Sequence, residues 1–323
     1  MSRPLDEICR LIRRSRSFAI TSHIAPDGDG VGSMFSMAAL LKGLGKKVTV
    51  VCDDAMPERY RFLGKTWVRT KDAGSLKPDC MITMECPVLT RVGHTIKIFR
   101  RAKYTINIDH HPGNDEYATV NWVNVGAAAT GEMIYELFKK MHYPLDQETA
   151  RLIYISILTD TGSFRYANTT RRTHAIAGEL IQYGVQPDRL MDEIYESNTY
   201  RGMRLLGRAL STLRRSPDKE IAWLAVTSRM LKESCAKSED ADGFVNFARN
   251  LRGTKVACFF LENNNGEVKV SLRSKRSIDV NQVAAAFGGG GHKAASGCQV
   301  KGRLAAVEKE VIAKIRMGLD DAR

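Results

Sequence analysis

The sequence lacks long hydrophobic runs, internal repeats and low-complexity segments. No apolar stretch approaches the roughly 20 residues that a membrane-spanning helix requires, so we expect a protein without a membrane segment. The first residues, Met-Ser-Arg-Pro-Leu-Asp-Glu, also lack the order of basic, apolar and small residues that marks a secretory signal peptide. These absences predict a cytoplasmic protein.

A C-x-x-C cysteine pair is absent as well, although the chain has seven cysteines. Their number is odd and their spacing is wide, which argues against a disulfide framework and against a structural zinc site. We therefore expect reduced and mostly buried thiols at Cys9, Cys52, Cys80, Cys86, Cys235, Cys258 and Cys298.

The chain has 323 residues, of which 43% are hydrophobic and 26% are charged, as in ordinary globular proteins. This length favours two domains, because single domains cluster at roughly 100–150 residues. The 49 basic and 36 acidic side chains leave a net charge of +13, which is spread over the chain rather than gathered in a tail. A positive field of this kind favours an anionic substrate or a nucleic-acid fragment over a long duplex.

Near-continuous apolar strands alternate with helices in the first half of the chain. This alternation predicts a parallel sheet that is covered by helices on both faces. The expected strands are 18–23, 47–52, 79–85 and 104–111. The expected helices are 5–17, 34–44, 130–141 and 147–159, with Gly45 at the C-cap of the second.

Acids and imidazoles recur where the expected strands end, which is where open α/β sheets place their active sites. The glycine-rich stretch from Thr21 to Ser33 follows the first strand and contains the first ligand-type side chains. Others follow the later strands, and one acid ends the helix 147–159. The complete candidate set is His23, Asp27, Asp29, Glu85, Asp109, His110, His111 and Asp160.

So many oxygen and imidazole ligands favour two metal ions that share a bridging carboxylate. Such a pair activates a water molecule and stabilises the leaving oxygen in phosphoryl displacement. The absence of thiolates from the set suits Mn²⁺ or Mg²⁺ better than Zn²⁺. Asp27 and Asp29 are two residues apart, so on an extended turn they point to opposite sides and each can serve a different ion.

The second half of the chain has a different pattern. A helix is expected at 172–183, and apolar positions at helical spacing predict a helical connection between domains at 188–215. Strands follow at 221–226, 256–261 and 268–273, and a hairpin turn at 263–266 joins the last two. A helix at 280–287, the glycine run 288–291 and a last helix at 304–317 complete the chain.

The glycine run has the character of a phosphate-binding loop. Its bare backbone amides, at Gly289, Gly290 and Gly291 among others, can surround a phosphate. His292 and Lys293 can add charge-assisted hydrogen bonds, and Arg273 on the preceding strand can form a bidentate clamp. Arg165 and Thr130 are weaker candidates for a phosphate contact.

These motifs resemble those of the DHH phosphoesterase superfamily, in the same order along the chain. The resemblance comprises His23-x3-Asp27-x-Asp29, the triplet Asp109-His110-His111 and Thr159-Asp160-Thr161-Gly162. The stretch from Gly288 to Gly297, with the strand that ends in Arg273, is similar to the signature of the DHHA1 domain. The resemblance implies a catalytic DHH domain at 1–187, a helical connector at 188–215 and a smaller mixed α/β DHHA1 domain at 216–323.

The resemblance also implies a role for each motif residue. His23 and Asp27 would hold one Mn²⁺, whereas Asp29, His110 and Asp160 would hold the second. His111 would lie beside the scissile phosphate, and Asp109 would orient an imidazole. The loop of the second domain would face the metal centre across an interdomain cleft and hold the oligonucleotide. One residue departs from the family, because Glu85 stands where the bridging residue is normally Asp.

Within this superfamily the two-domain length is most similar to the NrnA-type enzymes, which are oligoribonucleases (nanoRNases) and 3′-phosphoadenosine-5′-phosphate (pAp) phosphatases. We therefore predict a metal-dependent phosphodiesterase that converts short single-stranded oligonucleotides to nucleoside 5′-monophosphates and acts on pAp. Two alternatives stay open: a phosphodiesterase of cyclic dinucleotides or pApA, and a nucleotide-binding protein with a metal centre impaired at Glu85. A homodimer stays open as well.

Overall fold

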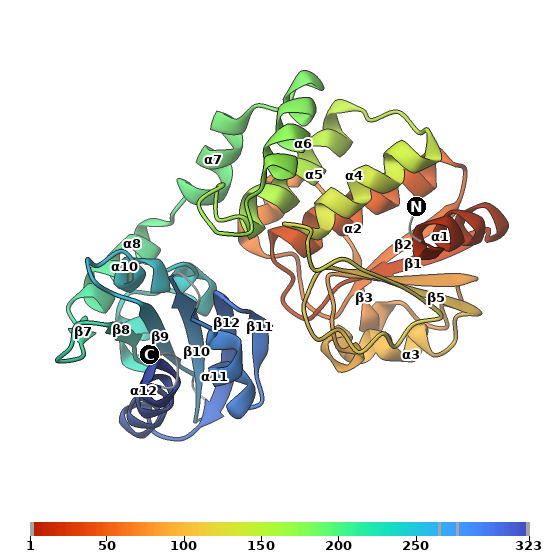
Figure 1. Ribbon diagram of the computed structural model, residues 1–323. Helices are drawn as coiled ribbons and strands as arrows, with labels where there is room; N and C mark the ends of the chain where they lie inside the picture. Colours follow the sequence, from red (N-terminus) through yellow and green to blue (C-terminus); the bar gives the residue numbers. More distant parts are fainter. Residues whose placement is uncertain (1–2, 264–265, 276–277, 321–323) are drawn as a thin grey trace. The chain divides into compact units, whose positions relative to one another are not determined.

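The computed structural model describes residues 3–263, 266–275 and 278–320 (Figure 1). The chain forms two compact units, Met1–Ser197 and Asn198–Arg323, and each is built around a sheet of its own. No helix within the described residues is long and apolar enough to cross a membrane.

The first unit is built on a six-stranded parallel sheet in the order β3-β2-β1-β4-β5-β6. The central strand β1 pairs with β2 on one side and with β4 on the other. The carboxyl ends of β1, β4 and β5 therefore lie side by side at one edge of the sheet. The strands are β1 (Ser17–Thr21), β2 (Lys47–Cys52), β3 (Val68–Arg69), β4 (Cys80–Met84), β5 (Tyr104–Asp109) and β6 (Val120–Val123).

Helices cover both faces of this sheet, as the sequence predicts. Alternate strand residues face opposite sides, so that Phe18 and Ile20 join the large core whereas Ala19 packs with the short helix α3 (Ile96–Phe99). The large core also receives α1 (Arg3–Arg14), α2 (Gly28–Gly43), α4 (Thr130–Met141), α5 (Gln147–Asp160), α6 (Arg171–Gln182) and α7 (Pro187–Tyr195). Short 3-10 helices at η1 (Glu58–Leu63), η2 (Thr70–Asp72) and η3 (Leu89–Thr95) complete the unit.

Helix α2 begins six residues earlier than the sequence predicts, at Gly28 instead of Met34. The side chain of Asp27 caps it by accepting a hydrogen bond from the Gly30 amide at 3.1 Å. The glycines are needed for close packing, because a Cβ atom on Gly28 would lie 2.4 Å from Thr159 and one on Gly32 would lie 2.4 Å from the Leu152 carbonyl. The glycines thus let α2 pack against α5 rather than form an extended turn.

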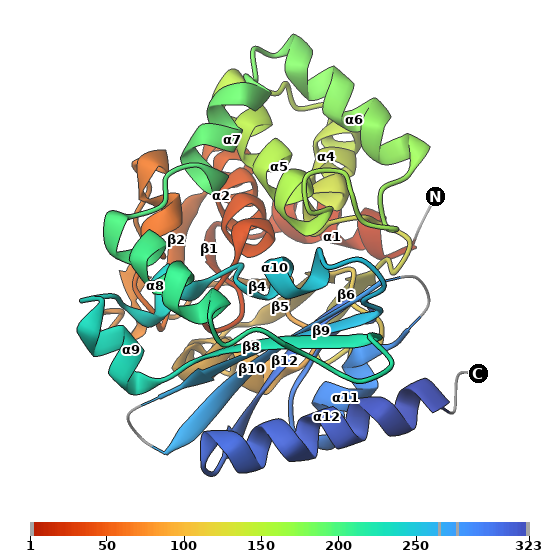
Figure 2. The same cartoon turned by 90° about the vertical axis from the view of Figure 1, so that its left-hand side faces the viewer.

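The second unit contains a mixed six-stranded sheet in the order β11-β12-β10-β9-β8-β7. Within the described residues, β8 and β9 are its one parallel pair. Figure 2 shows α11 and α12 on one side of this sheet and α8 and α10 on the other. The strands are β7 (Arg214–Arg215), β8 (Ile221–Val226), β9 (Val256–Glu262), β10 (Glu267–Ser274), β11 (Gly290–His292) and β12 (Ala295–Lys301). The helices are α8 (Tyr200–Leu210), α9 (Ser228–Glu233), η4 (Ser238–Ala241), α10 (Val245–Arg249), α11 (Val280–Ala286) and α12 (Leu304–Asp320).

The stretch expected as a connector, 188–215, is divided between the two units. Leu190 and Ile194 of α7 pack in the core of the first unit. Leu205 and Ala209 of α8 pack beneath the sheet of the second, and residues 214–215 form its edge strand. The apolar positions that suggested one connecting element therefore serve two separate cores.

The glycine run 288–291 also differs from the expected loop. Gly288 ends α11 with φ of +73°, whereas Gly290 and Gly291 belong to the edge strand β11. A Cβ atom on Gly289 would lie 2.2 Å from the Gly297 carbonyl, so β12 leaves no room for a side chain there. The hairpin turn expected at 263–266 includes residues 264–265, which lie outside the described residues, although β9 and β10 do pair antiparallel.

Candidate metal centre

His23, Asp27 and Glu85 form a first cluster, in which each offers one ligand atom within 4.8 Å of the others. His23 follows the end of β1, and Glu85 directly follows the neighbouring strand β4. The Nδ1–H of His23 donates to the Ile24 carbonyl at 2.7 Å, so that Nε2 faces Glu85 Oε2, also at 2.7 Å. Burial lowers the pKa of His23, which favours the neutral ring that binds metals.

Glu85 is held in an unusual backbone conformation. Its φ of +53° lies in the left-handed region, which costs a residue other than glycine about 1–3 kcal/mol. The side chain is only 3% exposed, and burial, together with the charges of Asp27 and Asp29, raises the pKa of Glu85 well above its ordinary value. Oε2 forms no hydrogen bond with any described residue, despite its short distance to His23 Nε2.

Asp29, His110 and Asp160 form a second cluster with the same 4.8 Å limit. The Nε2 atom of His110 lies 3.4 Å from Asp29 Oδ2 and 3.7 Å from Asp160 Oδ2. Its Nδ1–H donates to the Ala127 carbonyl at 3.1 Å. Burial disfavours the imidazolium, but the carboxylates of Asp160, Asp29 and Glu85 outweigh it and raise the pKa of His110 to about 9.

Asp29 is completely buried and is oriented by three hydrogen bonds from separate elements. The Ser33 hydroxyl donates to Oδ1 at 2.9 Å, and the Ser156 hydroxyl of α5 donates to the same atom at 2.5 Å. The Thr130 amide, at the start of α4, donates to Oδ2 at 2.8 Å. Burial nevertheless raises the pKa of Asp29 to about 6. Asp27 and Asp29 belong to different clusters. They do not lie on an extended turn, however, because Asp27 caps α2 and Asp29 lies in its first turn.

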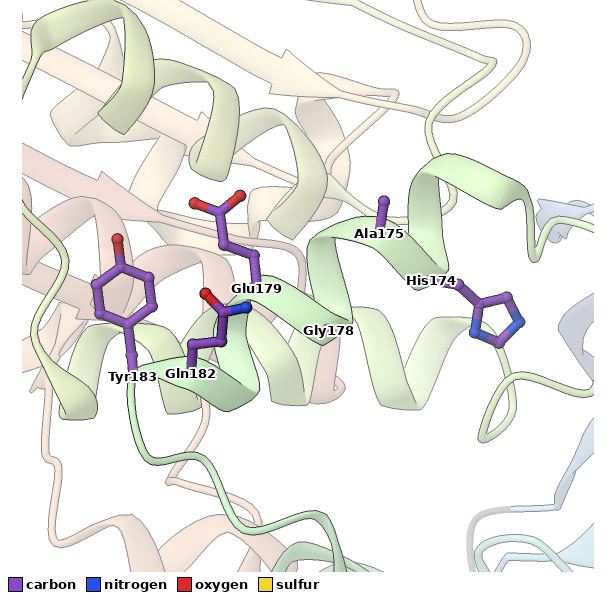
Figure 3. Close-up of a pocket in the computed structure, with 6 residues that line it drawn as sticks. All are labelled: His174, Ala175, Gly178, Glu179, Gln182 and Tyr183. Carbon is purple, nitrogen blue, oxygen red and sulfur yellow. The ribbon is translucent and has the colours of Figure 1, made fainter.

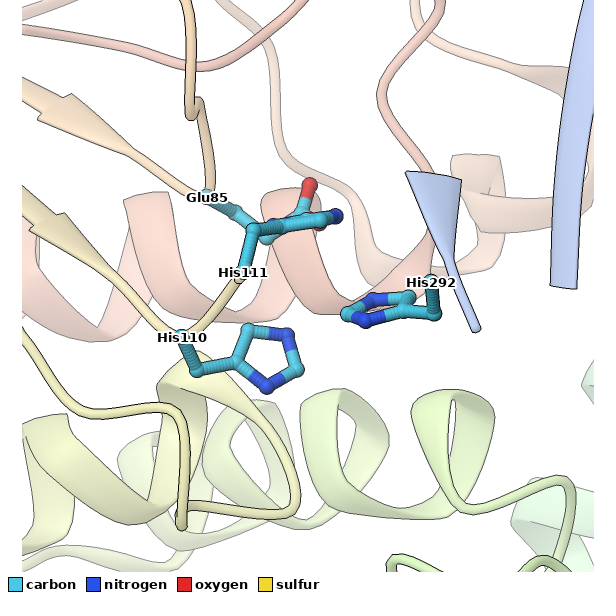
Figure 4. A group of neighbouring side chains, drawn as sticks. All are labelled: Glu85, His110, His111 and His292. Carbon is cyan, nitrogen blue, oxygen red and sulfur yellow. The ribbon is translucent and has the colours of Figure 1, made fainter. Parts of the chain in front are cut away.

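Glu85, His110 and His111 also offer atoms within 4.8 Å of one another, and Figure 4 shows their side chains converging. Glu85 is thus shared with the first cluster and His110 with the second. The Nε2 atom of His111 lies 3.4 Å from Glu85 Oε1. On its other side, the Nδ1–H of His111 donates to Asp109 Oδ1 at 2.8 Å.

The donor set fits divalent metal ions. All three imidazoles donate Nδ1–H to a fixed acceptor and turn Nε2 towards carboxylates, which is the pattern that orients ligating histidines. Buried carboxylates so close together repel one another, as the raised pKa values of Glu85 and Asp29 indicate. Cations would offset this repulsion, and the orphaned Glu85 Oε2 would gain a partner. Oxygen and nitrogen donors without thiolates suit Mn²⁺ or Mg²⁺.

The candidate substrate-binding residues of the second unit lie near one another on its sheet. Ala295 of β12 pairs with Arg273 of β10 on one side and with His292 of β11 on the other. Directly paired residues point to the same face, so the two basic side chains flank a small alanine. Lys293 follows β11, and its carbonyl accepts the Val280 amide at 2.9 Å. The guanidinium of Arg273 donates only to the adjacent Leu272 carbonyl in the described contacts, at 2.9 Å.

The weaker phosphate candidates lie elsewhere in the first unit. Arg165 is exposed and donates from Nε to the Gly162 carbonyl at 2.7 Å. Thr130 is buried and supports Asp29 through its amide. An open hollow runs along α6, but none of the candidate ligands lines it; Figure 3 shows its lining residues, His174, Ala175, Gly178, Glu179, Gln182 and Tyr183.

Several polar residues behind the centre do not appear among the sequence candidates. Asn107 is fully buried within the apolar strand β5 and is bonded to Thr83 and Tyr117. Asn114 donates to Asp109 Oδ2 at 2.5 Å. A lone amide in an apolar strand was the signal available for Asn107, whereas nothing in the spacing of Asn114 or Tyr117 pointed to the site.

Two known domains match the chain, in the order of its two units. Residues 17–157 match the DHH family, N-terminal domain, and residues 219–317 match the DHHA1 domain.

Relatives and a solved structure match over most of the chain. The Thermus thermophilus protein named bifunctional oligoribonuclease and PAP phosphatase NrnA is 35% identical, over 88% of this chain and 84% of that protein. The Bacillus subtilis protein of the same name is 27% identical, over 91% of this chain and 92% of that protein. The crystal structure of an exopolyphosphatase-related protein from Bacteroides fragilis has a TM-score of 0.88 at 26% identity and covers 98% of this chain and 96% of that chain.

Proposed function

The chain belongs to the DHH family of phosphoesterases, and we propose that it hydrolyses short single-stranded oligonucleotides to nucleoside 5′-monophosphates and removes the 3′-phosphate of pAp. The observation that carries this proposal is the pair of ligand clusters, built mostly from buried side chains, in a chain whose relatives are named for both activities. Neither alternative, cyclic-dinucleotide hydrolysis or nucleotide binding alone, is favoured by the comparisons.

Both activities break the same kind of bond, which supports one site for the two substrates. In the oligonucleotide, a water oxygen adds to phosphorus, the bond from phosphorus to the 3′-oxygen breaks, and the 3′-oxygen takes a proton. In pAp the same bond joins the 3′-oxygen to a terminal phosphate, so hydrolysis releases AMP and inorganic phosphate. No oxidant or second substrate is needed.

In our proposal each ligand cluster holds one divalent ion. His23 and Asp27 would hold the first and Asp29, His110 and Asp160 would hold the second, with the carboxylate of Glu85 shared between them. Such a pair of ions supplies Lewis-acid activation of water and stabilises the leaving oxygen. Mn²⁺ is the proposed ion, because it accepts both imidazole and carboxylate ligands.

His111 is the proposed contact to the scissile phosphate. Its Nδ1–H is held by Asp109, whose carboxylate stays ionised: burial opposes ionisation, but hydrogen bonds from His111 and Asn114 keep the pKa of Asp109 below its ordinary value. With the ring held in this orientation, a proton on Nε2 can be donated to a phosphate oxygen as negative charge develops. His111 and Asp109 thus act together.

The second unit supplies the proposed substrate-binding residues. Arg273 and His292 flank Ala295 on one face of the sheet, and Lys293 adds a further positive charge. Guanidinium and ammonium groups bind phosphates through charge-assisted hydrogen bonds. Gly288 and Gly290 are the glycines of the run with space beside them, whereas Gly289 and Gly291 pack against β12. A cytoplasmic location, in line with seven free cysteines, and a homodimer remain parts of the proposal.

A turnover panel with Mn²⁺ tests the proposed function. The substrates are pAp, a dinucleotide, a five-mer, a longer RNA, cyclic di-AMP and linear polyphosphate. We expect rapid hydrolysis of pAp and the dinucleotide, with turnover falling as the chain lengthens. Preferential hydrolysis of cyclic di-AMP or polyphosphate would contradict the proposal, and binding without turnover of any substrate would favour the nucleotide-binding alternative.

A further inference from the structure

A buried polar network joins the ends of β4 and β5 behind the metal centre. The side-chain amide of Asn107 donates to Thr83 Oγ1 at 3.0 Å and to the Cys86 carbonyl at 3.1 Å. The hydroxyl of Tyr117 lies 2.9 Å from the same Cys86 carbonyl and 3.0 Å from the Asn107 amide nitrogen. Thr83 and Asn107 are direct register partners on the two strands.

Asn114 extends this network to Asp109. Its amide nitrogen lies 2.8 Å from Asn107 Oδ1 and 2.5 Å from Asp109 Oδ2. The other carboxylate oxygen, Oδ1, accepts the Nδ1–H of His111 at 2.8 Å. One continuous chain of hydrogen bonds therefore runs from the Cys86 carbonyl to the imidazole of His111.

The two ends of the network lie next to Glu85 and His111, whose conformations must be held by their surroundings. Cys86 directly follows Glu85, whose left-handed backbone persists only if its surroundings hold it. Glu85 itself is held by one further backbone bond, from its amide to the Ile108 carbonyl at 2.9 Å. At the opposite end, Asp109 fixes the orientation of His111. Polar groups buried in apolar strands are costly unless they are satisfied, and here Asn107 is satisfied by several partners.

We propose that Asn114 and Tyr117 are positioning residues of the hydrolytic site: Asn114 acts through Asp109 on His111, and Tyr117 acts through the Cys86 carbonyl on Glu85. This inference rests on the proposed function, because it assigns roles within the same site. In the described contacts neither residue bonds to a side chain of the two ligand clusters. Asn114 fixes Asp109, which orients His111, and Tyr117 fixes the Cys86 carbonyl beside Glu85. Outer partners of metal ligands act in the same indirect way.

The first test compares Asn114→Ala with Asn121→Ala. Asn121 braces the same loop, because its side chain bonds the backbone of Glu116 and Ala118, but it makes no described contact with Asp109. We expect Asn114→Ala to lower kcat for pAp by about 10- to 100-fold with KM changed less than about threefold, as outer-partner substitutions typically do. Asn121→Ala should keep kcat near the wild-type value. An equal loss of kcat in both variants would overturn the positioning role of Asn114 and show that it only stabilises the loop.

A double-mutant cycle shows whether Asn114 works through Asp109. If it does, Asn114→Ala should cost nothing further in a chain that already carries Asp109→Ala, since the group it positions is gone. Additive losses would contradict this part of the inference. Thermal unfolding of each variant identifies any loss of fold.

The second test removes only the hydroxyl of Tyr117. Tyr117→Phe keeps the ring and its edge contact with Phe99, whereas Tyr135→Phe removes a hydroxyl bonded to Glu179 on α6. By loosening Glu85, Tyr117→Phe should weaken Mn²⁺ binding by about 10-fold in calorimetric titration, and Tyr135→Phe should leave it unchanged. Unchanged Mn²⁺ affinity in Tyr117→Phe would overturn the role of Tyr117. Metal titration needs no substrate, so it stays informative even if wild-type protein hydrolyses none of the panel, which would be a failure of the proposed function instead.

Discussion

At the scale of single residues, Glu85 decides how the two ligand clusters are joined. Its carboxylate reaches His23 with one oxygen and faces His111 with the other. Glu85 has one methylene more than the Asp that the family resemblance implies, and its backbone at the end of β4 is left-handed. The charge of this side chain and its length can therefore be tested separately.

Glu85→Asp keeps the charge but shortens the side chain, whereas Glu85→Gln keeps the length and removes the charge. Asp also tolerates a positive φ better than Glu does, so part of the backbone cost is relieved. We expect Glu85→Asp to retain activity within about 10-fold and Glu85→Gln to lose about 100-fold or more, because bridging two cations requires the negative charge. Steady-state kinetics with saturating Mn²⁺ measures both. A Glu85→Asp variant as inactive as Glu85→Gln would contradict this expectation and show that the length of the side chain matters more for activity than its charge.

The raised pKa of Glu85 predicts a pH dependence of stability in the metal-free protein. An acid whose pKa is higher in the folded state stabilises the fold fully below its unfolded pKa and loses that contribution as the pH rises. Metal-free wild-type protein should therefore lose stability relative to Glu85→Gln as the pH is raised above about 4.5. Urea unfolding at several pH values measures the difference. A gap that stays constant with pH would contradict the prediction.

At the scale of elements, the contact between α2 and α5 places Asp29 in the centre. Gly32 faces the Leu152 carbonyl at a distance that leaves no room for a Cβ atom, and Ser156, one turn further along α5, donates to Asp29. The position of this carboxylate therefore depends on how closely the two helices approach.

Gly32→Ala should separate the helices, destabilise the first unit by about 1–3 kcal/mol and weaken Mn²⁺ binding. Gly178→Ala is the matched control, because a Cβ atom on Gly178, within α6, would meet open space, so alanine there should stabilise the helix by about 0.4–1 kcal/mol. Chemical denaturation and metal titration of the two variants give the comparison. Equal stability of both variants would contradict the packing role of Gly32.

Much of the first sheet could be predicted from sequence, because its strands are short apolar runs that end in acids or imidazoles. β2 and α4 have the predicted bounds, 47–52 and 130–141. The start of α2 could not be predicted, since glycines disfavour helices locally and only the packing against α5 explains them. The same holds for β11, where glycines that suggest a free loop are required by the neighbouring strand.

The candidate ligands could be found because each follows a strand or ends a helix, whereas their grouping came from the family resemblance and not from the spacing of the residues. The spacing of Asn114 and Tyr117 carries no comparable signal, because their importance depends on bonds to strands that are distant in the chain. Residues that support a site from behind its ligands are identified by tertiary contacts and not by the local sequence pattern.

At the scale of the whole molecule, a net charge of +13 coexists with a buried cluster of carboxylates in the first unit. A positive field favours anionic ligands, whereas divalent cations would offset the repulsion between the carboxylates of the cluster. We therefore expect metal binding and folding of the first unit to be coupled.

Mn²⁺ should therefore protect the first unit against opening. At about 100 times its dissociation constant, a ligand that binds only the folded state adds about 2.7 kcal/mol to stability. Amide hydrogen exchange at the ends of β1, β4 and β5 should be slower with Mn²⁺ than in the metal-free protein. Exchange at these strand ends that does not respond to Mn²⁺ would contradict the coupling.

The most direct test of the central claim is a parallel assay of both activities in one variant of the metal centre. His23→Ala removes an imidazole of the first cluster, and His174→Ala removes an exposed imidazole on α6 as the control. We predict that His23→Ala loses Mn²⁺-dependent hydrolysis of a dinucleotide and of pAp together, each by about 100-fold or more, while His174→Ala retains both. Survival of either activity in His23→Ala would contradict a single metal centre that serves both reactions.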